Sequence, residues 1–366
     1  MFRYRLARLG LVSPGSPMNL TFSVTNRCQS RCKTCKIWGL YKRNPTKSHD
    51  ELNLNEIEKI FRSMGHIFIF NMSGGEPFLR SDIVEVVSLA CKYLTPGIIH
   101  IPTNAIAVNK IEENVIDILK VVNSSDPSIQ LTVKPSLDHI GDKHDEIRGV
   151  KGNFEKVIEL FKRLKGLQSK YKNLHAELGT VISGWNVADM EEIANFITTL
   201  GGDSYRNEIA EQRSEMFNKG DPITPSAAEY ERAIRGFTKV LKKNMKQHSP
   251  FQKITQAFRL TYYDLAIGIL KENKQAIPCY AGLSNAHMSP YGDIWACCTL
   301  GYEKSMGNLR DFSYDFPALW NSRQAKKVRH YIKGRSCACP LANQVYSNIL
   351  LHGPSLLKTI RTLFAK

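Results

Sequence analysis

Apolar and polar residues along the chain follow two alternating patterns. Short apolar runs of a strand's length are followed by longer segments whose apolar residues recur every three or four positions, as on one face of a helix. Strands are expected at residues 19–24, 66–72, 97–103, 129–134, 174–182 and 204–209. Helices are expected between them at residues 53–64, 81–93, 111–122, 154–167 and 190–199.

This alternation of strands and helices predicts an α/β fold. Consecutive strands joined by helical crossovers pair in parallel, with right-handed connections. Because there are about six units rather than the eight of a complete barrel, we expect a partial (β/α)6, TIM-like barrel at residues 18–210. A basic segment at 1–17 precedes it, and a helical connector at 211–275 follows, with helices at 227–245 and 251–270.

The length, composition and net charge of the chain limit the classes of protein to which it can belong. The chain has 366 residues and no apolar run near the ~18 residues of a transmembrane helix. No signal peptide is visible before the first cysteines, so we expect a cytoplasmic protein. Its net charge of +16 suits an anionic membrane, an acidic substrate or nucleic acid. Because no zinc finger, RNA-binding or helix-turn-helix pattern accompanies the charge, we expect no nucleic-acid partner.

Eight of the nine cysteines fall into two groups, residues 28–35 and 279–339. Grouped cysteines in a cytoplasmic chain favour metal ligation over disulfides. In the first group, Cys28, Cys32 and Cys35 form a C-x3-C-x2-C motif just after the first predicted strand. Three thiolates so close together can bind three irons of a [4Fe–4S] cluster and leave the fourth iron open.

A zinc site or a disulfide framework is the alternative for this first group. Zinc needs a fourth ligand, and His66 or Cys91 is available for that role. Cys91, however, stands alone in a helical pattern and is expected to be a buried core residue.

The run Gly74-Gly75-Glu76-Pro77 follows the second predicted strand directly. Two glycines let the backbone approach a ligand closely, and at the C-terminal end of a parallel strand the loop faces the barrel mouth. An ordinary glycine turn is the alternative. One strand–helix unit after C-x3-C-x2-C, this run resembles the radical S-adenosylmethionine (SAM) superfamily.

The resemblance implies a (β/α)6 barrel and a specific chemistry. Cys28, Cys32 and Cys35 would be the catalytic cluster ligands, and the amino and carboxylate groups of SAM would chelate the open iron. One electron would then split SAM into methionine and a 5′-deoxyadenosyl radical, which abstracts a substrate hydrogen. Gly74, Gly75, Glu76 and Pro77 would hold the SAM amino group.

Other segments resemble further SAM-binding motifs of this superfamily. Thr103-Asn104 matches T-N-G, with Ala105 in place of the glycine. Ser136 and Asp138 belong to an S-L-D stretch and are candidates for contacts near the ribose.

Arg148 ends an H-D-x-I-R stretch and is a candidate for the SAM carboxylate region. Asn186 follows a segment similar to the fifth-strand motif beside the adenine. Loop capping and a surface ion pair are the alternative roles for Ser136, Asp138 and Arg148. One position departs from the family, because Thr34 replaces the aromatic residue usual before the third cysteine; Trp38 could take its place.

The second cysteine group resembles the SPASM/Twitch auxiliary-cluster domain, which we expect at residues 276–342. The resemblance rests on a C…G-x4-C pattern ending at Cys297, on a hairpin turning at Tyr291-Gly292, and on the closing Cys337-Ala338-Cys339-Pro340. Five cysteines suffice for one auxiliary [4Fe–4S] cluster, as in the Twitch form. Its predicted ligands are Cys279, Cys297, Cys337 and Cys339. Cys298 is either spare or the fourth ligand in place of Cys339.

The C-terminal tail at residues 343–366 is basic and amphipathic. Leu356, Ile360 and Leu363 fall on one face, with Lys358 and Arg361 nearby, and the N-terminal residues 1–9 are similar. Such helices can lie on anionic membranes, whereas packing against the barrel is the alternative.

These patterns predict a radical SAM enzyme that uses SAM and two [4Fe–4S] clusters. It would abstract hydrogen from an unactivated carbon of a lipid or lipid-linked substrate at the membrane surface and could form a carbon–carbon bond. A peptide maturase or epimerase is the alternative, and a non-catalytic iron–sulfur electron carrier is the second alternative. The expected partners are an anionic membrane surface and a flavodoxin- or ferredoxin-type electron donor.

Overall fold

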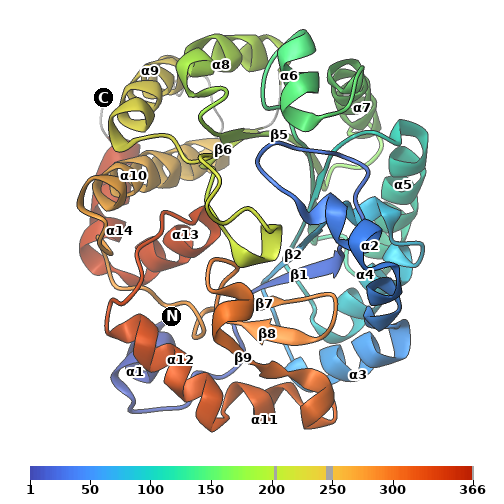
Figure 1. Ribbon diagram of the computed structural model, residues 1–366, viewed down its shortest axis with the longest axis vertical. Coiled ribbons are helices and arrows are strands. Elements are labelled where there is room, and N and C mark those ends of the chain that lie inside the picture. Colours follow the sequence, from blue (N-terminus) through green and yellow to red (C-terminus); the bar gives the residue numbers. More distant parts are fainter. Residues whose placement is uncertain (202–203, 245–249, 365–366) are drawn as a thin grey trace.

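The computed structural model describes residues 1–201, 204–244 and 250–364 (Figure 1). Within them, nine strands form one sheet in the order β6-β5-β4-β3-β2-β1-β7-β8-β9. The first six strands are parallel neighbours in sequence order: β1 (Asn19–Thr25), β2 (Ile69–Gly74), β3 (Ile98–Thr103), β4 (Gln130–Pro135), β5 (Leu174–Ile182) and β6 (Ser204–Ile209). The predicted partial (β/α)6 barrel is therefore confirmed.

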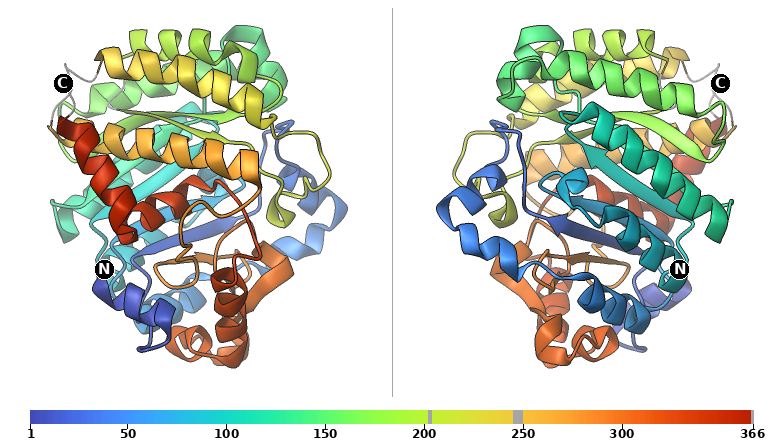
Figure 2. Two further views of the ribbon diagram at one scale, coloured as in Figure 1. Left: turned by 90° about the vertical axis from the view of Figure 1, so that its left-hand side faces the viewer. Right: turned by 90° about the vertical axis from the view of Figure 1, so that its right-hand side faces the viewer.

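Helices cover the outer face of this parallel sheet (Figure 2). They are α3 (Leu54–Met64), α4 (Ile83–Tyr93), α5 (Val108–Ser125), α6 (Gly141–Arg148), α7 (Asn153–Leu167) and α8 (Met190–Thr199), while the short α2 (Leu40–Arg43) follows the first cysteine loop. Except in α6, their inward faces are apolar. Phe61 of α3, for example, contacts Phe22 and Phe70 of the strands edge to face, with ring centroids 6.2 and 5.6 Å away. Such burial is the main driving force for this layered arrangement.

The C-terminal cysteine segment continues the barrel sheet instead of standing apart from it. Strand β7 (Asn285–Met288) pairs in parallel with β1. The antiparallel strands β8 (Asp293–Trp295) and β9 (Ser305–Asn308) extend the same edge. The predicted hairpin is thus present, and it places the auxiliary cysteines beside the first strand of the barrel.

Helices of the connector and of the C-terminal segment complete the ring. They are α9 (Ala227–Asn244), α10 (Pro250–Glu272), α11 (Phe316–Trp320), α12 (Arg323–Lys333), α13 (Ala342–Leu351) and α14 (Gly353–Phe364). In Figure 1, α10, α13 and α14 lie between β6 and the β7–β9 side, and α12 lies beside the N-terminal helix α1 (Phe2–Leu9). The domain bounds given above stay a prediction.

The C-terminal helix α14 packs with its polar side inward. Ser355 and Thr359 are buried, and the Thr359 hydroxyl lies 2.8 Å from that of Thr261 in α10. Leu357 and Ile360 are 51% and 43% exposed. Helix α14 is therefore docked on the protein while part of its apolar face stays in solvent. None of the described helices is both long and apolar enough to cross a membrane.

Candidate active site

The first cysteine group lies in an irregular loop that follows β1. Cys28, Cys32 and Cys35 are all partly buried there. Burial, together with the neighbouring Cys32 thiol, raises the pKa of Cys28 and of Cys35 to about 12. Iron binds the thiolate form, and bound iron would supply the positive charge that three crowded thiolates lack. The donor set therefore fits an iron–sulfur cluster.

The cysteine loop is held by the end of α6. The backbone N–H groups of Arg31 and Lys33 donate hydrogen bonds to the carbonyl oxygens of Arg148 and Ile147, at 3.0 and 2.9 Å. Gly149 follows with a φ of +66°, and a Cβ on it would lie 2.5 Å from the Arg31 carbonyl oxygen. The I-R-G stretch thus supports the cysteine loop through its backbone.

The G-G-E-P loop supports the base of the cysteine loop from the other side. Gly75 and Glu76 donate backbone hydrogen bonds to the carbonyl oxygens of Thr25 and Arg27, both at 2.8 Å. A Cβ on Gly75 would overlap the Arg27 carbonyl group. The second glycine is therefore required by a close approach of two backbones.

The Glu76 side chain links this loop to the T-N motif after β3. Its buried carboxylate accepts hydrogen bonds from the Asn104 N–H at 2.7 Å and the Thr103 hydroxyl at 2.9 Å. Burial raises the pKa of Glu76 to about 7. The Asn104 amide nitrogen lies 3.9 Å from the Cys28 sulfur. Ala105 adopts a φ of +60°, the left-handed conformation that the family's glycine adopts without strain.

Arg148 forms a buried ion pair with Asp138, at 3.1 Å. Its Nε is buried and has no partner among the described residues, so it is a free donor for an anionic ligand group. The other Asp138 oxygen accepts the Val181 N–H at 2.8 Å, and the Asp138 carbonyl accepts from the Asn186 amide at 2.8 Å. The alternative of a surface ion pair is therefore wrong, because this ion pair lies in the interior.

A cavity of about 220 Å³ brings most of the predicted SAM-site residues together. It is lined by Cys28, Cys32, Cys35, Gly74, Gly75, Glu76, Pro77, Thr103, Asn104, Ser136 and Arg148. Asp138 and Asn186 do not line this cavity, because their polar atoms form hydrogen bonds with other residues behind the cavity wall. We therefore assign these two residues a positioning role instead of the predicted direct contact.

The apolar wall of this cavity differs from our expectation. Trp38 does not line it, since its ring lies beside Lys42, with the Lys42 Nζ 5.4 Å from the ring centroid. Thr34 lines the cavity, together with the apolar side chains of Met216 and Ile223. Both come from the segment after β6, which the sequence pattern indicated only as a connector.

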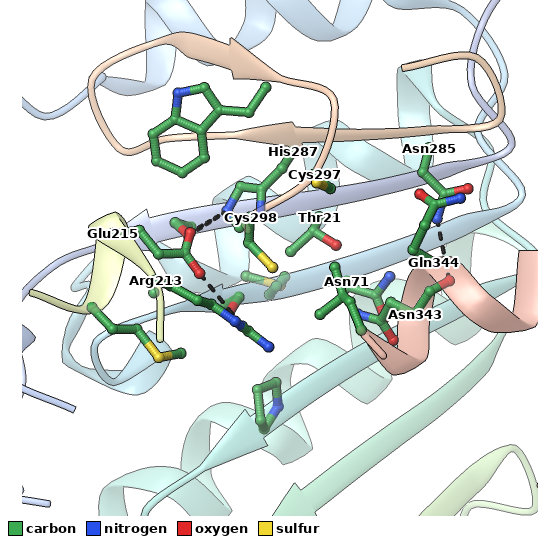
Figure 3. Close-up of a pocket in the computed structure, with 18 of the residues that line it drawn as sticks. Thr21, Asn71, Arg213, Glu215, Asn285, His287, Cys297, Cys298, Asn343 and Gln344 are labelled. Carbon is green, nitrogen blue, oxygen red and sulfur yellow. Dashed lines mark hydrogen bonds and ion pairs between the residues drawn. The ribbon is translucent and has the colours of Figure 1, made fainter. Parts of the chain in front are cut away.

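The second cysteine group also gathers in space. Cys279, Cys297, Cys337 and Cys339 are partly buried, and burial raises the pKa of each thiol. The nearby thiols of Cys339, Cys298 and Cys279 add to the raised pKa of Cys297, and Cys337 adds to that of Cys279. Cys298 is buried and lies near Arg213 and Glu215 as well as near Cys339 (Figure 3). The grouping supports the four predicted ligands, and the choice between Cys298 and Cys339 stays open.

Neither suggested zinc ligand is near the first cysteine loop. His66 Nδ1 lies 2.9 Å from the Thr95 hydroxyl, and Cys91 sits between α4 and α5 beside Lys120. Among the residues that the structure describes, no three His, Cys, Asp or Glu side chains are close enough to hold a single metal ion. The structure pairs none of the nine cysteines, all of which are described, in a disulfide.

A second cavity, of about 200 Å³, lies between the two cysteine groups. Cys35 lines it on one side, and Cys297 and Cys298 line it on the other. Strands β1 and β2 contribute Thr21 and Asn71, and the C-terminal segment contributes amide side chains (Figure 3). These amides are Asn285, Asn343 and Gln344. A bound molecule here would lie between both cysteine groups.

A charged cluster lines the same cavity and was missed from the sequence. Glu215 lies 3.5 Å from Arg213 and 3.7 Å from His287 Nε2, and that nitrogen lies 2.8 Å from the Ser23 hydroxyl (Figure 3). Burial raises the pKa of Glu215 to about 7 and lowers that of His287 to about 3. Arg213 and Glu215 follow β6, the edge where every other motif lies, and that position was the available signal.

Comparisons with known proteins agree with this site. A model described as "Radical SAM superfamily" matches residues 22–197, and one described as "Iron-sulfur cluster-binding domain" (SPASM) matches residues 279–340. The antilisterial bacteriocin subtilosin biosynthesis protein AlbA of Bacillus subtilis is 22% identical over 92% of this chain and 69% of its own. Mycofactocin maturase MftC of Mycolicibacterium smegmatis is 25% identical over 51% of this chain and 43% of its own.

Two solved structures show the same fold. Streptococcus suis SuiB bound to S-adenosylmethionine has a TM-score of 0.59 at 15% identity and covers 89% of this chain and 70% of SuiB. Native anSMEcpe with bound AdoMet has a TM-score of 0.61 at 14% identity, over 95% of this chain and 97% of anSMEcpe. The predicted cofactors, SAM and two iron–sulfur clusters, agree with both matched domains. The chain therefore belongs to the radical SAM superfamily of enzymes and carries a C-terminal SPASM iron–sulfur domain.

Proposed function

We propose that this enzyme modifies a residue of a peptide held in the cavity between Cys35 and Cys297. This is the alternative that the sequence offered beside a lipid substrate. Relatives named for bacteriocin biosynthesis and mycofactocin maturation support it, as does the similarity to SuiB, whose structure with the precursor peptide SuiA is known. None of these comparisons supports a lipid substrate.

The single observation that carries the proposal is the lining of this cavity. Asn71, Asn285, Asn343 and Gln344 present amide groups to it, and Arg213 and Glu215 present charges. Amides match the alternating N–H and C=O groups of a peptide backbone. The Gln344 Oε1 is buried without a partner among the described residues, and a hydrocarbon chain would leave it unpaired at a cost of about 1–3 kcal/mol. The lining therefore favours a polar, peptide-like substrate over an acyl chain.

One set of residues would bind SAM in the first cavity, and another would bind the peptide in the second. Cys28, Cys32 and Cys35 would hold the first cluster, and Glu76 and Arg148 would orient the amino and carboxylate groups of SAM. When bound, the cluster and SAM supply the radical that abstracts hydrogen. The residues around the second cavity would orient the peptide carbon toward the first cavity, which borders the same Cys35 side chain.

Hydrogen transfer from a labelled extract tests the substrate class directly. A perdeuterated cell extract is divided into a peptide fraction and a lipid fraction, and each is incubated anaerobically with reconstituted enzyme, SAM and dithionite. Abstraction breaks a C–D bond of the substrate and leaves deuterium on 5′-deoxyadenosine. We expect deuterated 5′-deoxyadenosine with the peptide fraction only. Label from the lipid fraction alone would overturn the proposal.

A cavity variant adds a matched control to this experiment. Gln344 is 3% exposed, and its Oε1 has no partner among the described residues. Gln344→Met keeps the shape of the side chain and removes the amide. It should lower deuterium transfer while SAM cleavage without substrate continues. Equal loss of both reactions would place Gln344 in the SAM site instead.

A peripheral membrane contact is a separate proposal, about location. Leu357 and Ile360 on α14 are exposed beside Arg361, although Lys358 is paired with Asp264 at 2.6 Å. Exposed apolar groups with neighbouring positive charge favour the interface of an anionic membrane.

A further inference from the structure

The excess of positive over negative charge comes from the two ends of the chain. Residues 1–49 contain ten Lys and Arg residues and no Asp or Glu. Residues 316–366 contain nine Lys and Arg residues and again no Asp or Glu. These nineteen charges exceed the net charge of +16, so the long middle part, which holds all 34 acidic residues, is slightly acidic.

The fold brings parts of both acid-free ends together around one surface cavity. Helices α1 and α12 lie side by side (Figure 1). Residues of α1, of the turn that follows it and of α12 line a cavity of about 460 Å³. Five basic side chains line it, and none of its described lining residues is acidic. The five are Arg8, Lys326, Arg329, His330 and Lys333. We call this surface the α1/α12 basic cavity.

Arg329 is held in place at this cavity without a counter-charge. Its Nε donates to the Gly282 carbonyl oxygen, and its guanidinium carbon lies 4.5 Å from the centroid of the Trp320 ring. Its Nη2 is buried and has no partner among the described residues. Burial lowers the pKa of Arg329 to about 10. A guanidinium held in this way without a counter-charge suits an anionic group of a partner.

The same cavity reaches the auxiliary cysteines. Cys279, one of the four proposed ligands, is among its lining residues. Cys279 is coupled to Cys297, which borders the inner cavity that Cys35 also lines. Val12, which is 41% exposed, adds an apolar side chain to the cavity wall. Clustered charge of one sign steers the association of an oppositely charged partner.

From this arrangement we infer that the α1/α12 basic cavity is the docking site of an acidic electron-transfer protein of the flavodoxin or ferredoxin class. The docked protein gives one electron to the iron–sulfur centre that Cys279 is proposed to hold, and no bond or proton is exchanged. Cleavage of SAM consumes one electron from outside the chain, and that electron enters at the α1/α12 basic cavity. An acidic peptide would satisfy the charges but would give no reason for Cys279 in the cavity wall.

Binding of a purified acidic flavodoxin to the reconstituted holoenzyme tests the site without any substrate. Titration of flavin fluorescence at low ionic strength gives the dissociation constant. The variant Arg8→Gln/Lys326→Gln/Lys333→Gln should bind about tenfold more weakly, since each lost charge pair contributes less than about 1 kcal/mol. Its affinity should also depend less steeply on salt. Circular dichroism confirms that the variant is folded.

A control variant carries the same charge change on the outer side of the barrel, on α5 and on the connections before and after α7. Lys110, Lys151 and Lys172 are exposed and distant from α1 and α12 in the ring. Lys110→Gln/Lys151→Gln/Lys172→Gln should bind within about twofold of the wild type.

The cysteine loop is the competing entry point, because Arg27 and Arg31 are exposed there. Weaker binding by Arg27→Gln/Arg31→Gln, with unchanged binding by the α1/α12 variant, would overturn the inference. Vesicles of anionic phospholipid that bind through the α1/α12 residues while flavodoxin does not bind would overturn it as well. The assay contains no peptide, so the proposed substrate class can fail without affecting its result.

Discussion

Gly149→Ala tests how the cysteine loop is held, and Gly152→Ala is its matched control. Both glycines lie in the turn between α6 and α7 in the left-handed region, at φ of +66° and +74°. A Cβ on Gly152 would meet no atom within 4 Å, whereas a Cβ on Gly149 would lie 2.5 Å from the Arg31 carbonyl oxygen. The pair therefore separates backbone strain from displacement of the cysteine loop.

The expected losses of stability follow from the backbone strain and from the overlap with the cysteine loop. An L-residue in the left-handed conformation costs about 1–2 kcal/mol, and a less flexible unfolded chain returns about 0.4–1 kcal/mol. Gly152→Ala should thus lower the free energy of unfolding by about 1 kcal/mol. Gly149→Ala adds an overlap of the kind that costs about 1–3 kcal/mol in well-packed sites. The cysteine loop can relieve this overlap only by moving away from α6.

The assay is iron content with SAM cleavage. Two four-iron clusters predict about eight irons per reconstituted wild-type chain. Gly152→Ala should keep about eight irons, and Gly149→Ala should fall toward four with little 5′-deoxyadenosine formed. Thermal unfolding of the apoprotein measures the stability loss separately. If Gly149→Ala keeps its iron and cleaves SAM as Gly152→Ala does, the support assigned to the I-R-G stretch is refuted.

Three further predictions address the clusters, the barrel and the tail. Replacing Cys28, Cys32 and Cys35 by Ala should leave about four irons per chain and abolish 5′-deoxyadenosine formation; retained SAM cleavage would contradict their assignment. Buried Glu177 lies 2.8 Å from Arg259 and 3.3 Å from Arg206. In urea unfolding, Glu177→Gln should lower the free energy of unfolding by about 3–5 kcal/mol. The control Glu159→Gln, at an exposed ion pair, should lower it by less than about 1 kcal/mol. Burial alone would raise the pKa of Glu177, but these arginines hold it below its usual value of 4.5. The stabilisation by Glu177 is therefore present above pH 4.5 and is lost as the pH falls. Equal costs for the two variants would contradict this role. Leu357→Asp/Ile360→Asp should reduce co-sedimentation with anionic liposomes, and unchanged sedimentation would show that α14 is not an anchor.

The parts of the fold that local pattern determines were predictable from the sequence. The bounds expected for β5, α8 and β6 agree with those observed, at residues 174–182, 190–199 and 204–209. Helix α8 buries a regular apolar face, and in β6 every second residue is buried. Helix α6 was missed because its sequence, GDKHDEIR, has only one apolar residue and therefore no apolar stripe. Hydrogen bonds to the cysteine loop give this helix a role that hydrophobic pattern cannot show.

The SAM half of the site was predictable because its motifs occupy equivalent places. Cys28, Glu76, Asn104 and Ser136 follow four successive strands, and parallel strands bring their C-terminal ends to one edge. The motifs could not show which of these residues are exposed to the cavity and which are buried behind its wall. Asp138 carries a family motif yet is fully buried behind the cavity wall, and that distinction depends on partners more than 40 residues away in sequence.

The substrate half of the site depends on a pairing that no local pattern reveals. Strand β7 joins β1 in parallel across more than 250 residues of sequence, and this pairing carries Asn285 and His287 into the barrel mouth. Helix α13 then adds Asn343 and Gln344 opposite the SAM cavity. Under the proposed function, superfamily motifs would hold SAM, whereas the residues that would contact the substrate come largely from the C-terminal segment. Differences in substrate between such enzymes should accordingly follow residues 285–287 and 341–344 more closely than the barrel motifs.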